Sequence, residues 1–247
     1  MVEQCLDKAL VKSSILFLGT KNMEDDAAAL VRRLALKTRF SEMGWGSTPL
    51  LSANQYKEQQ MPSVFLVSDT HFGHAGVCRF TRNDGVTKLR PWTDPDEMDE
   101  EMIRRWNDRV RPNDKVYHLG DVVINRRSLP TLARLNGDKV LIRGNHDIFR
   151  DTEYTQYFRE LRAYHVMNGM ILSHIPVHHE SLGRFGVNIH GHLHANRVLD
   201  KHGKVDVRYH CVCVEQTDFR PILFEDVIKR IKDEGGEVGF KDGSPSM

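Results

Sequence analysis

Short apolar runs alternate with amphipathic stretches along the chain after residue 60. Runs rich in β-branched and other apolar residues predict strands at residues 64–69, 115–121, 139–144, 170–174, 187–192 and 207–216. Apolar positions at helical spacing predict helices at residues 95–110, 129–136, 152–162 and 224–234. Strands that alternate with helices are typical of a layered α/β or α+β domain.

Two of these helices carry end signals. Asp94 is an N-cap candidate, and Pro95 suits the first turn because its missing N–H has no partner there in any case. The last helix is expected to end at Gly235 or Gly236, since glycine adopts the left-handed conformation that closes many helices.

The first 60 residues differ in pattern from the rest of the chain. A short apolar run at residues 15–18 predicts a strand, and an amphipathic stretch at 24–40 predicts a helix. A Gly-, Ser-, Asn- and Gln-rich segment then reaches residue 60 and is typical of a linker. We therefore expect an N-terminal extension over residues 1–60, a compact domain over 61–234 and a flexible tail over 235–247.

The extension has two interpretations. It is either a small βα unit that packs on the domain or self-associates through Leu30, Val31 and Leu34, or a dispensable leader upstream of a natural start at Met61. The pattern does not separate these, and the oligomeric state stays open.

Charge and cysteine content narrow the class of protein. The 35 Lys and Arg residues nearly balance 34 Asp and Glu, so no global charge indicates nucleic acid or an anionic membrane as a partner. Four cysteines in 247 residues form no disulfide framework, and Cys211 and Cys213 alternate with valines as in a buried strand. With no secretory signal and no apolar run of about 18 residues, we expect a soluble protein in a reducing cytoplasm.

Polar residues with metal-binding side chains follow five of the predicted strands. They are Asp69 and His71, Asp121, Asn145 with His146 and Asp147, His174, and finally His192 and His194. Any one of these is better explained as the start of a polar loop, and the glycines beside them as turn residues. Independent turns do not explain the whole series, and open α/β sheets form ligand sites along this edge. His118, His165, His202 and His210 are interpreted as structural.

The stretch "VNIHGHLHA" (187–195) has the same two interpretations: a surface strand whose polar face is histidine, or half of a metal site. Carboxylate, amide and imidazole donors without thiolate suit Mn²⁺, Fe, Zn²⁺ or Ni²⁺. The donors exceed what one ion needs, so they indicate two ions, an arrangement that serves in-line displacement at phosphorus.

The motifs "DTH", "GDVV", "RGNHD", "SH" and "HGHLH", in this order, resemble those of the calcineurin-like metallophosphoesterases. The likeness covers residues 61–224, and its context resembles the small uncapped enzymes of bacteria and phages. It implies an α/β (α+β) fold of four layers, in which helices flank two mixed β-sheets. It also implies a metal-dependent hydrolase with two divalent ions, Mn²⁺ first and Fe, Zn²⁺ or Ni²⁺ as alternatives.

The resemblance implies a role for each matching residue. One ion would be held by Asp69, His71 and His194, the other by Asn145, His174 and His192, with Asp121 bridging the two; His190 would be structural or supporting. A hydroxide between the ions would attack phosphorus in line, with His146 as general acid and Asp147 orienting its ring. One departure is that Ile124, not an acidic or amide residue, stands three positions after Asp121, and Asn125 follows it.

The substrate is less well defined by the sequence. His74, Arg79 and Arg143 are candidates for substrate binding, and the loop that contains Arg79 also carries Arg82, Lys88 and Arg90. These cations either face a substrate with several phosphates or are simply solvated. With no room for a large cap, we expect a phosphodiesterase acting on a small soluble nucleotide-like substrate. The alternatives are a phosphomonoesterase, then a nuclease, since nucleic acid is not excluded, and then a non-catalytic metal-binding scaffold.

Overall fold

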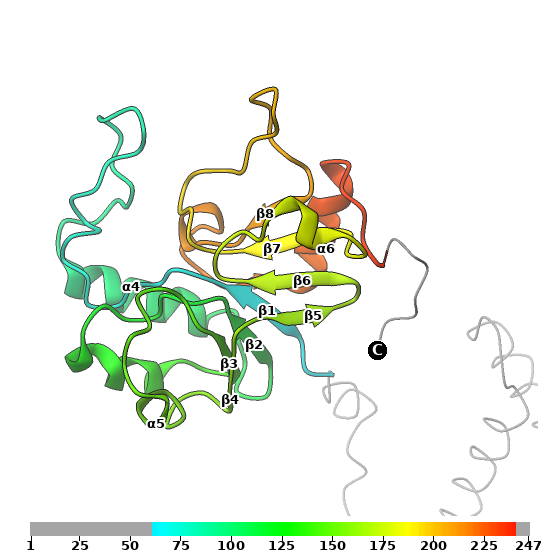
Figure 1. Ribbon diagram of the computed structural model, residues 1–247. Helices are drawn as coiled ribbons and strands as arrows, with labels where there is room; N and C mark the ends of the chain where they lie inside the picture. The colour runs from blue at the N-terminus through cyan, green and yellow to red at the C-terminus, as the bar shows by residue number, and fades with distance from the viewer. Residues whose placement is uncertain (1–60, 241–247) are drawn as a thin grey trace, which may run out of the picture. The chain divides into compact units, whose positions relative to one another are not determined.

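The structure is a computed structural model, and it describes residues 61–240. The expectations for residues 1–60 and 241–247 lie outside these residues. Within residues 61–240, nine strands form two mixed sheets with helices around them, which confirms the predicted fold class (Figure 1). No helix of residues 61–240 has the length and apolar content that crossing a membrane requires.

The larger sheet has five strands in the order β4-β3-β2-β1-β9. Their bounds are β1 Val64–Val67, β2 Lys115–His118, β3 Asp138–Ile142, β4 Glu160–Arg162 and β9 Ile222–Leu223. Strands β1 to β4 are parallel, and β9 adds an antiparallel edge beside β1. Because these four strands run the same way, the residues that follow each of them emerge on one side of the sheet.

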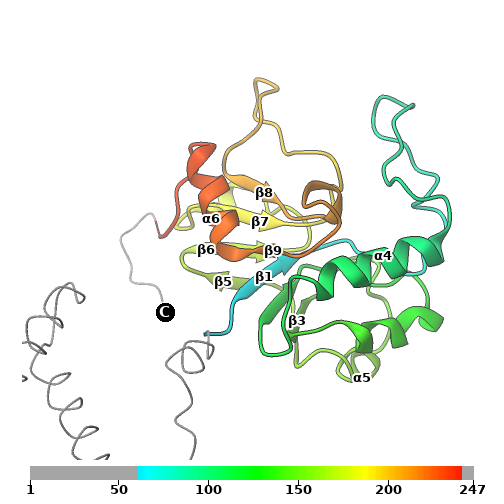
Figure 2. The same cartoon turned by 180° about the vertical axis from the view of Figure 1, so that it is seen from behind.

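The smaller sheet has four strands in the order β5-β6-β7-β8. Their bounds are β5 His165–Met167, β6 Met170–Ser173, β7 Asn188–His190 and β8 Tyr209–Cys211. β6, β7 and β8 are parallel, whereas β5 is antiparallel to β6. This sheet stacks on the larger one, as Figures 1 and 2 show from opposite sides.

Both faces of the larger sheet are apolar, because alternate residues of a strand point to opposite faces. In β1, Phe65 and Val67 pack in one cluster with the helices, while Leu66 packs in a second cluster between the sheets. The second cluster also takes Leu172 and Ile189 from the smaller sheet, together with residues of α6 (Phe224–Asp233). The stacked sheets therefore share a continuous core.

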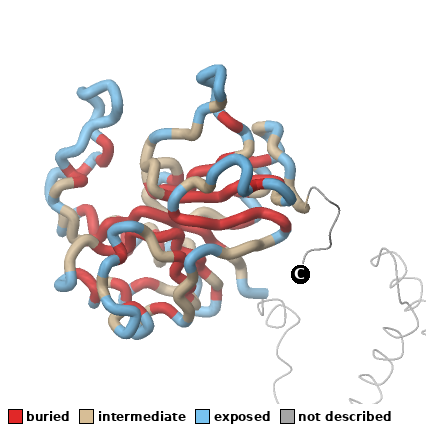
Figure 3. The backbone as a smooth tube through the Cα atoms, in the orientation of Figure 1, coloured by how far each residue is buried: buried red, intermediate tan, exposed pale blue. Residues whose placement is uncertain are grey.

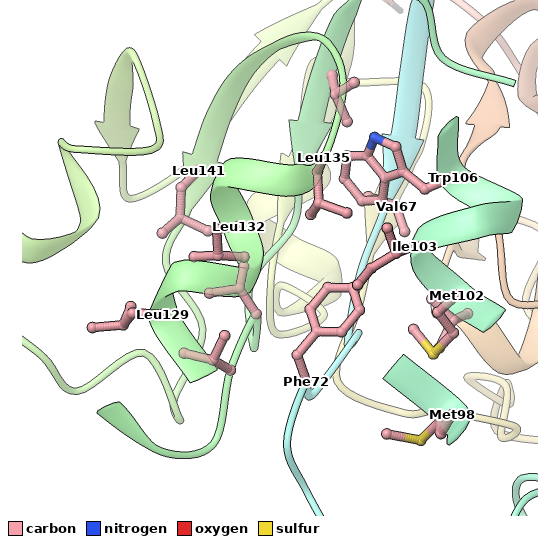
Figure 4. Close-up of a cluster of buried hydrophobic side chains, with 14 of the residues drawn as sticks. Val67, Phe72, Met98, Met102, Ile103, Trp106, Leu129, Leu132, Leu135 and Leu141 are labelled. Atoms are coloured by element: carbon pink, nitrogen blue, oxygen red, sulfur yellow. The ribbon is translucent and has the colours of Figure 1, made fainter. Parts of the chain in front are cut away.

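Helix α4 (Pro95–Asn107) covers the outer face of the larger sheet with α5 (Asp151–Tyr154) and the 3₁₀ segment η1 (Arg126–Arg134). The predicted N-cap is confirmed, since the side chain of Asp94 accepts a hydrogen bond from the Asp96 N–H. Met98, Ile103 and Trp106 of α4 belong to the same buried cluster as Val67 of β1 (Figure 4). This packing fixes α4 against the strand that leads into the first polar turn.

The last helix ends as expected at a glycine. Gly235 has a φ of +86°. Its N–H donates to the carbonyl of Lys232, and the Gly236 N–H donates to that of Ile231. These two bonds form a Schellman motif, which satisfies carbonyls that the end of the helix would otherwise leave unpaired.

The structure corrects several predicted elements. The predicted helix at 152–162 is wrong beyond Tyr154, because the Arg159 N–H bonds to the carbonyl of Lys139 in β3 and the chain continues as strand β4. Strands β4, β5 and β9 are not predicted from the sequence. The strand predicted at 207–216 is limited to Tyr209–Cys211, and a 3₁₀ turn, η3 (Val214–Gln216), follows it. The helix predicted at 129–136 is the 3₁₀ segment η1.

Candidate metal centre

The polar turns after β1, β2, β3, β6 and β7 meet where the two sheets adjoin. The turn after β1 is tied to the turn after β2 by backbone bonds from Asp69 N–H to the Gly120 carbonyl and from His71 N–H to the Asp121 carbonyl. The Gly191 N–H in turn donates to the carbonyl of His174, which links the two turns of the smaller sheet. The strand ends therefore bring five sequence-distant motifs into one cluster.

A first donor group consists of Asp69, His71 and His194, whose candidate ligand atoms all lie within 4.8 Å of one another. Asp69 Oδ1 is 3.7 Å from His71 Nε2 and 3.9 Å from His194 Nε2. The other oxygen of Asp69 accepts hydrogen bonds from the Ser68 hydroxyl and the His192 N–H. Asp69 is thus anchored through Oδ2 and presents Oδ1 to the two imidazoles.

A second donor group consists of Asp121, His174 and His192, again with candidate ligand atoms within 4.8 Å of one another. Asn145 joins this group, because its Oδ1 lies 2.9 Å from His174 Nε2 and 2.9 Å from His192 Nδ1. The opposite ring nitrogen of His174 lies 2.7 Å from the Leu119 carbonyl, which fixes the orientation of this ring.

Asp121 lies between the two groups. Its Oδ2 is 3.6 Å from His71 Nε2 in the first group and 3.4 Å from His174 Nε2 in the second. Its Oδ1 accepts the backbone N–H of His146 at 2.8 Å. One carboxylate oxygen therefore faces a histidine of each group.

The donors fit a pair of divalent cations. Asp69 Oδ1 and both ring nitrogens of His71 are buried and have no hydrogen-bond partner among residues 61–240. Buried polar atoms are otherwise nearly always paired, because leaving them unpaired is costly. A cation in the first group would give Asp69 Oδ1 and one ring nitrogen of His71 a partner, and carboxylate, amide and imidazole are suitable ligand types for an ion in either group.

The electrostatics of the cluster are those of opposite charges held together. Burial disfavours the charged forms of Asp69 and Asp121, but the neighbouring histidines hold the pKa of each below the usual value. Facing carboxylates raise the pKa of His174 and of His194 above the usual value. The cluster thus already favours ionised carboxylates, the form in which they bind a cation.

His146 and Asp147 lie beside the cluster but differ in their surroundings. His146 is exposed, and its ring centroid is 5.5 Å from that of His71. The buried carboxylate of Asp147 instead accepts the backbone N–H groups of Asp121, Val122 and Gly144. These bonds tie the turns after β2 and β3 together, which differs from the expected role of orienting the His146 ring.

The expected substrate-binding residues are dispersed. His74 is near the cluster, with its ring 5.6 Å from that of His71, and burial lowers the pKa of His74 to about 4. Arg79 is exposed on the following loop. Arg143 points into its own loop, where it donates to the carbonyls of Asp147 and Phe149 and pairs with Asp151. Arg143 therefore supports the turn from behind rather than facing a substrate.

Three supporting residues are not assigned from the sequence. Arg90, expected in a solvated or substrate-facing loop, is fully buried and pairs with Glu215 behind the first donor group. The side chain of Asn125 donates to the Gly73 carbonyl and accepts from Ser128, so it holds the turn next to His74. Of these three residues, only Glu215 has a feature in the sequence that could have marked it: its charge directly follows the apolar run "CVCV".

Residues 62–242 match a family model described as calcineurin-like phosphoesterase. An uncharacterized protein of Methanocaldococcus jannaschii, MJ1445, is 34% identical over 188 residues, which cover 72% of this chain and 95% of that protein. A crystal structure of AQ665 from Aquifex aeolicus, a protein of unknown function, shares 24% identity with a TM-score of 0.49, over 68% of this chain and 99% of that one. The structure of an archaeal phosphodiesterase shares 20% identity with a TM-score of 0.35, over 61% of this chain and 82% of that one.

Proposed function

The chain belongs to the calcineurin-like phosphoesterase family, and on this premise we propose that it is a phosphodiesterase for a small nucleotide-like substrate. Members of the family are metal-dependent phosphoester hydrolases, so the reaction class follows from membership. The bond that is cut, the metal and the residue roles are our proposals.

The observation that carries the proposal is the position of Asp121 between two complete donor groups. In our assignment Asp69, His71 and His194 hold one ion, Asn145, His174 and His192 hold the other, and Asp121 contacts both. Two ions bound there would neutralise charge on the phosphoryl oxygens and make water a competent nucleophile near neutral pH. The protein's part is to hold these donors in place before the substrate arrives.

We assign His146 as the general acid. Its backbone is fixed by the bond from its N–H to Asp121 Oδ1, while its ring is exposed next to His71. A ring at this position can donate a proton to the leaving oxygen of a phosphoester lying against the donor groups. Asp147 contributes indirectly, because its carboxylate fixes the backbone of Gly144, just before His146, to the turn after β2.

We propose Mn²⁺ as the first choice of metal, with Fe, Zn²⁺ and Ni²⁺ as alternatives, because the donors are oxygens and imidazole nitrogens. The thiol of Cys213 lies beside the first donor group and donates to Asp69 Oδ2 at 3.1 Å. Burial raises the pKa of Cys213 well above the usual value, so it remains a thiol and is a poor ligand. The buried free thiols Cys78, Cys211 and Cys213 also support a reducing, cytoplasmic location.

The loop after the first motif supports a substrate larger than inorganic phosphate. Arg79, Arg82 and Lys88 are exposed there, and Figure 3 shows the loop standing away from the domain. The exposed ring of Phe80 makes an edge contact with His74, with centroids 5.7 Å apart. A flat organic group next to the phosphate has an aromatic surface to contact here, and further phosphates have cations nearby.

The test is a hydrolysis panel on metal-stripped protein. Bis(p-nitrophenyl) phosphate and p-nitrophenyl phosphate are compared while Mn²⁺, Ni²⁺, Zn²⁺ or Mg²⁺ is added back in turn. Metal-dependent turnover that favours the diester is expected, and cyclic and linear nucleotides would then be screened. A preference for the monoester would replace the phosphodiesterase with a phosphatase, and folded protein without turnover under any metal would favour a binding role.

A further inference from the structure

Two buried charges lie directly behind the first donor group and have no part in the proposed chemistry. The side chains of Arg90 and Glu215 are both 0% exposed, although 125 positions separate them in the sequence. Arg90 Nε and Nη2 each lie 2.8 Å from Glu215 Oε1. Arg90 follows the exposed loop after the first motif, and Glu215 lies in η3.

Arg90 holds the turn that carries Asp69 and His71. Its Nη2 donates to the Asp69 carbonyl at 2.6 Å, and its Nη1 donates to the Thr70 carbonyl at 2.8 Å. Asp69 and His71 both have left-handed backbone, with φ of 59° and 50°. Such a conformation is unfavourable for residues other than glycine and persists only where the surroundings fix it. The guanidinium is one of the groups that fix it.

Glu215 holds the third member of the same group. Its Oε1 lies 3.1 Å from Nδ1 of His194, while His194 Nε2 is the ring nitrogen that faces Asp69 Oδ1. A hydrogen bond from Nδ1 to a carboxylate selects the tautomer with a bare Nε2 and fixes the plane of the ring. Arg90 and Glu215 therefore reach all three members of the first donor group, directly or through the turn.

Stability alone does not account for this pair. A buried ion pair contributes little net stability, because the desolvation of both charges offsets their attraction, and apolar residues of similar volume often serve as well or better. No hydrogen bond or ion pair in residues 61–240 connects either side chain to the second donor group. Of the two donor groups in residues 61–240, the hydrogen bonds of Arg90 and Glu215 thus reach only the first.

We propose that Arg90 and Glu215 are a positioning pair for the ion held by Asp69, His71 and His194. The pair presets the bend of the first turn and the orientation of the His194 ring, and it leaves the second ion unaffected. This inference rests on the proposed two-ion assignment.

The test replaces the pair by apolar residues of similar size, in the full chain with the double substitution Arg90→Met and Glu215→Leu. Removing both charges together avoids leaving one of them buried without a partner, so the fold is expected to persist. Mn²⁺ binding to metal-stripped protein is measured by titration calorimetry, and the fold by circular dichroism and urea unfolding. We expect one ion to bind about 10- to 100-fold more weakly and the other to bind as before.

The chain offers a matched control. Arg197 and Glu234 form another ion pair, and Glu234 Oε2 lies 3.7 Å from Nδ1 of a buried histidine, His210. The substitutions Arg197→Met and Glu234→Leu remove the same kind of ion pair, here a partly exposed one, outside both donor groups, and both ions should bind as in the natural chain. Equal weakening in the two double variants would overturn the inference, since it would reflect general destabilisation.

The remaining outcomes separate this inference from the proposed function. If the natural chain binds two ions and the Arg90/Glu215 variant binds both unchanged, the inference alone is overturned. If the natural chain binds fewer than two, the two-ion assignment falls and the inference with it. Should the double variant not fold, ¹⁵N NMR of the natural chain loaded with Zn²⁺ decides. An Nδ1 proton of His194 shifted strongly downfield, as in a hydrogen bond to a carboxylate, supports the pair, and an Nδ1 proton without that shift, or a proton on Nε2, overturns it.

Discussion

Five of the seven proposed ligands have left-handed backbone. The φ values are 59° at Asp69, 50° at His71, 58° at Asp121, 68° at His192 and 50° at His194. Each such residue costs on the order of 1–3 kcal/mol, so the rest of the structure must hold it in place. This backbone geometry makes each turn sharp. As a result, alternate side chains such as His192 and His194 point into different donor groups.

The general-acid assignment of His146 predicts a loss that depends on the leaving group. His146→Ala should reduce kcat about 10²- to 10⁴-fold for a diester with an alkoxide leaving group. The reduction should be much smaller for bis(p-nitrophenyl) phosphate, because p-nitrophenolate leaves without needing a proton. Steady-state kinetics on both substrates check this.

Measuring the metal content of the His146→Ala variant shows whether the substitution has disrupted the donor groups. His146→Ala should keep the metal content of the natural chain, because His146 belongs to neither donor group. Substitution of the exposed loop residue His202 by Ala should change nothing. An equal loss on both substrates would argue against proton donation by His146.

At the residue scale the sequence predicts which side chains converge but not how the neighbours are used. Six of the proposed ligands follow the end of a strand, and parallel strands bring such positions together. They are Asp69, His71, Asp121, His174, His192 and His194. Asp147 bonds to backbone N–H groups, and Arg90 bonds to two backbone carbonyls besides Glu215, so their partners depend on the finished turns. No spacing in the sequence encodes them.

At the scale of the elements, the turns after β2 and β3 approach each other at Gly144. A methyl group at Gly144 would lie 2.2 Å from Asp121 Oδ1 and 2.6 Å from Asp121 N, well inside contact distance. Gly144→Ala should therefore displace Asp121 and weaken Mn²⁺ binding at least tenfold, while the core strands stay folded.

Calorimetric titration of metal-stripped protein measures this effect. Gly183→Ala serves as control, since a methyl group there meets only the Glu180 carbonyl at 3.8 Å. If Gly144→Ala bound both ions normally, the proposed place of Asp121 between them would be in error.

Helix α4 carries a buried carboxyl that predicts a pH dependence of stability. Burial raises the pKa of Asp99 from its ordinary value of 3.8 to about 7, and its Oδ2 accepts the Gly73 N–H. Between these pH values the folded state binds more protons than the unfolded state. The free energy of unfolding contributed by Asp99 therefore falls as pH rises from 4 to 7, and stays low above that.

Asp99→Asn should remove this dependence, because asparagine keeps the acceptor but cannot ionise. Relative to the natural chain, the variant should gain on the order of 2–4 kcal/mol in unfolding free energy between pH 4 and pH 8, because a pKa difference of one unit is worth about 1.4 kcal/mol and partial exposure of the carboxyl lowers the total. Urea unfolding of metal-stripped protein at both pH values gives the difference. A constant difference would show that Asp99 does not titrate in this range.

The strands absent from the sequence prediction share one property. β4, β5 and β9 all lie at an edge of their sheet. Edge strands are commonly short and charged, which limits pairing with other molecules and also removes the apolar pattern that marks a strand. In β4, Glu160 and Arg162 flank a single leucine. Periodicity predicts all the central strands and, among the edge strands, only β8, which follows the same apolar pattern.

For the whole molecule, we propose that the domain beginning at Met61 is sufficient for folding and catalysis. Residues 61–240 contain both sheets, both donor groups and a continuous core. A shortened chain that begins at Met61 should therefore keep the circular dichroism spectrum of its sheets and the kcat/KM of the full chain. A large loss of kcat/KM from a folded shortened chain would assign residues 1–60 a part in substrate binding or assembly.

The central claim is that two ions share this site with Asp121 between them. Anomalous diffraction from crystals grown with Mn²⁺ tests it most directly, because it locates each ion without reference to activity. We predict two anomalous peaks, one against Asp69, His71 and His194 and one against Asn145, His174 and His192, with Asp121 contacting both. A single peak, or two peaks without Asp121 between them, would contradict the account.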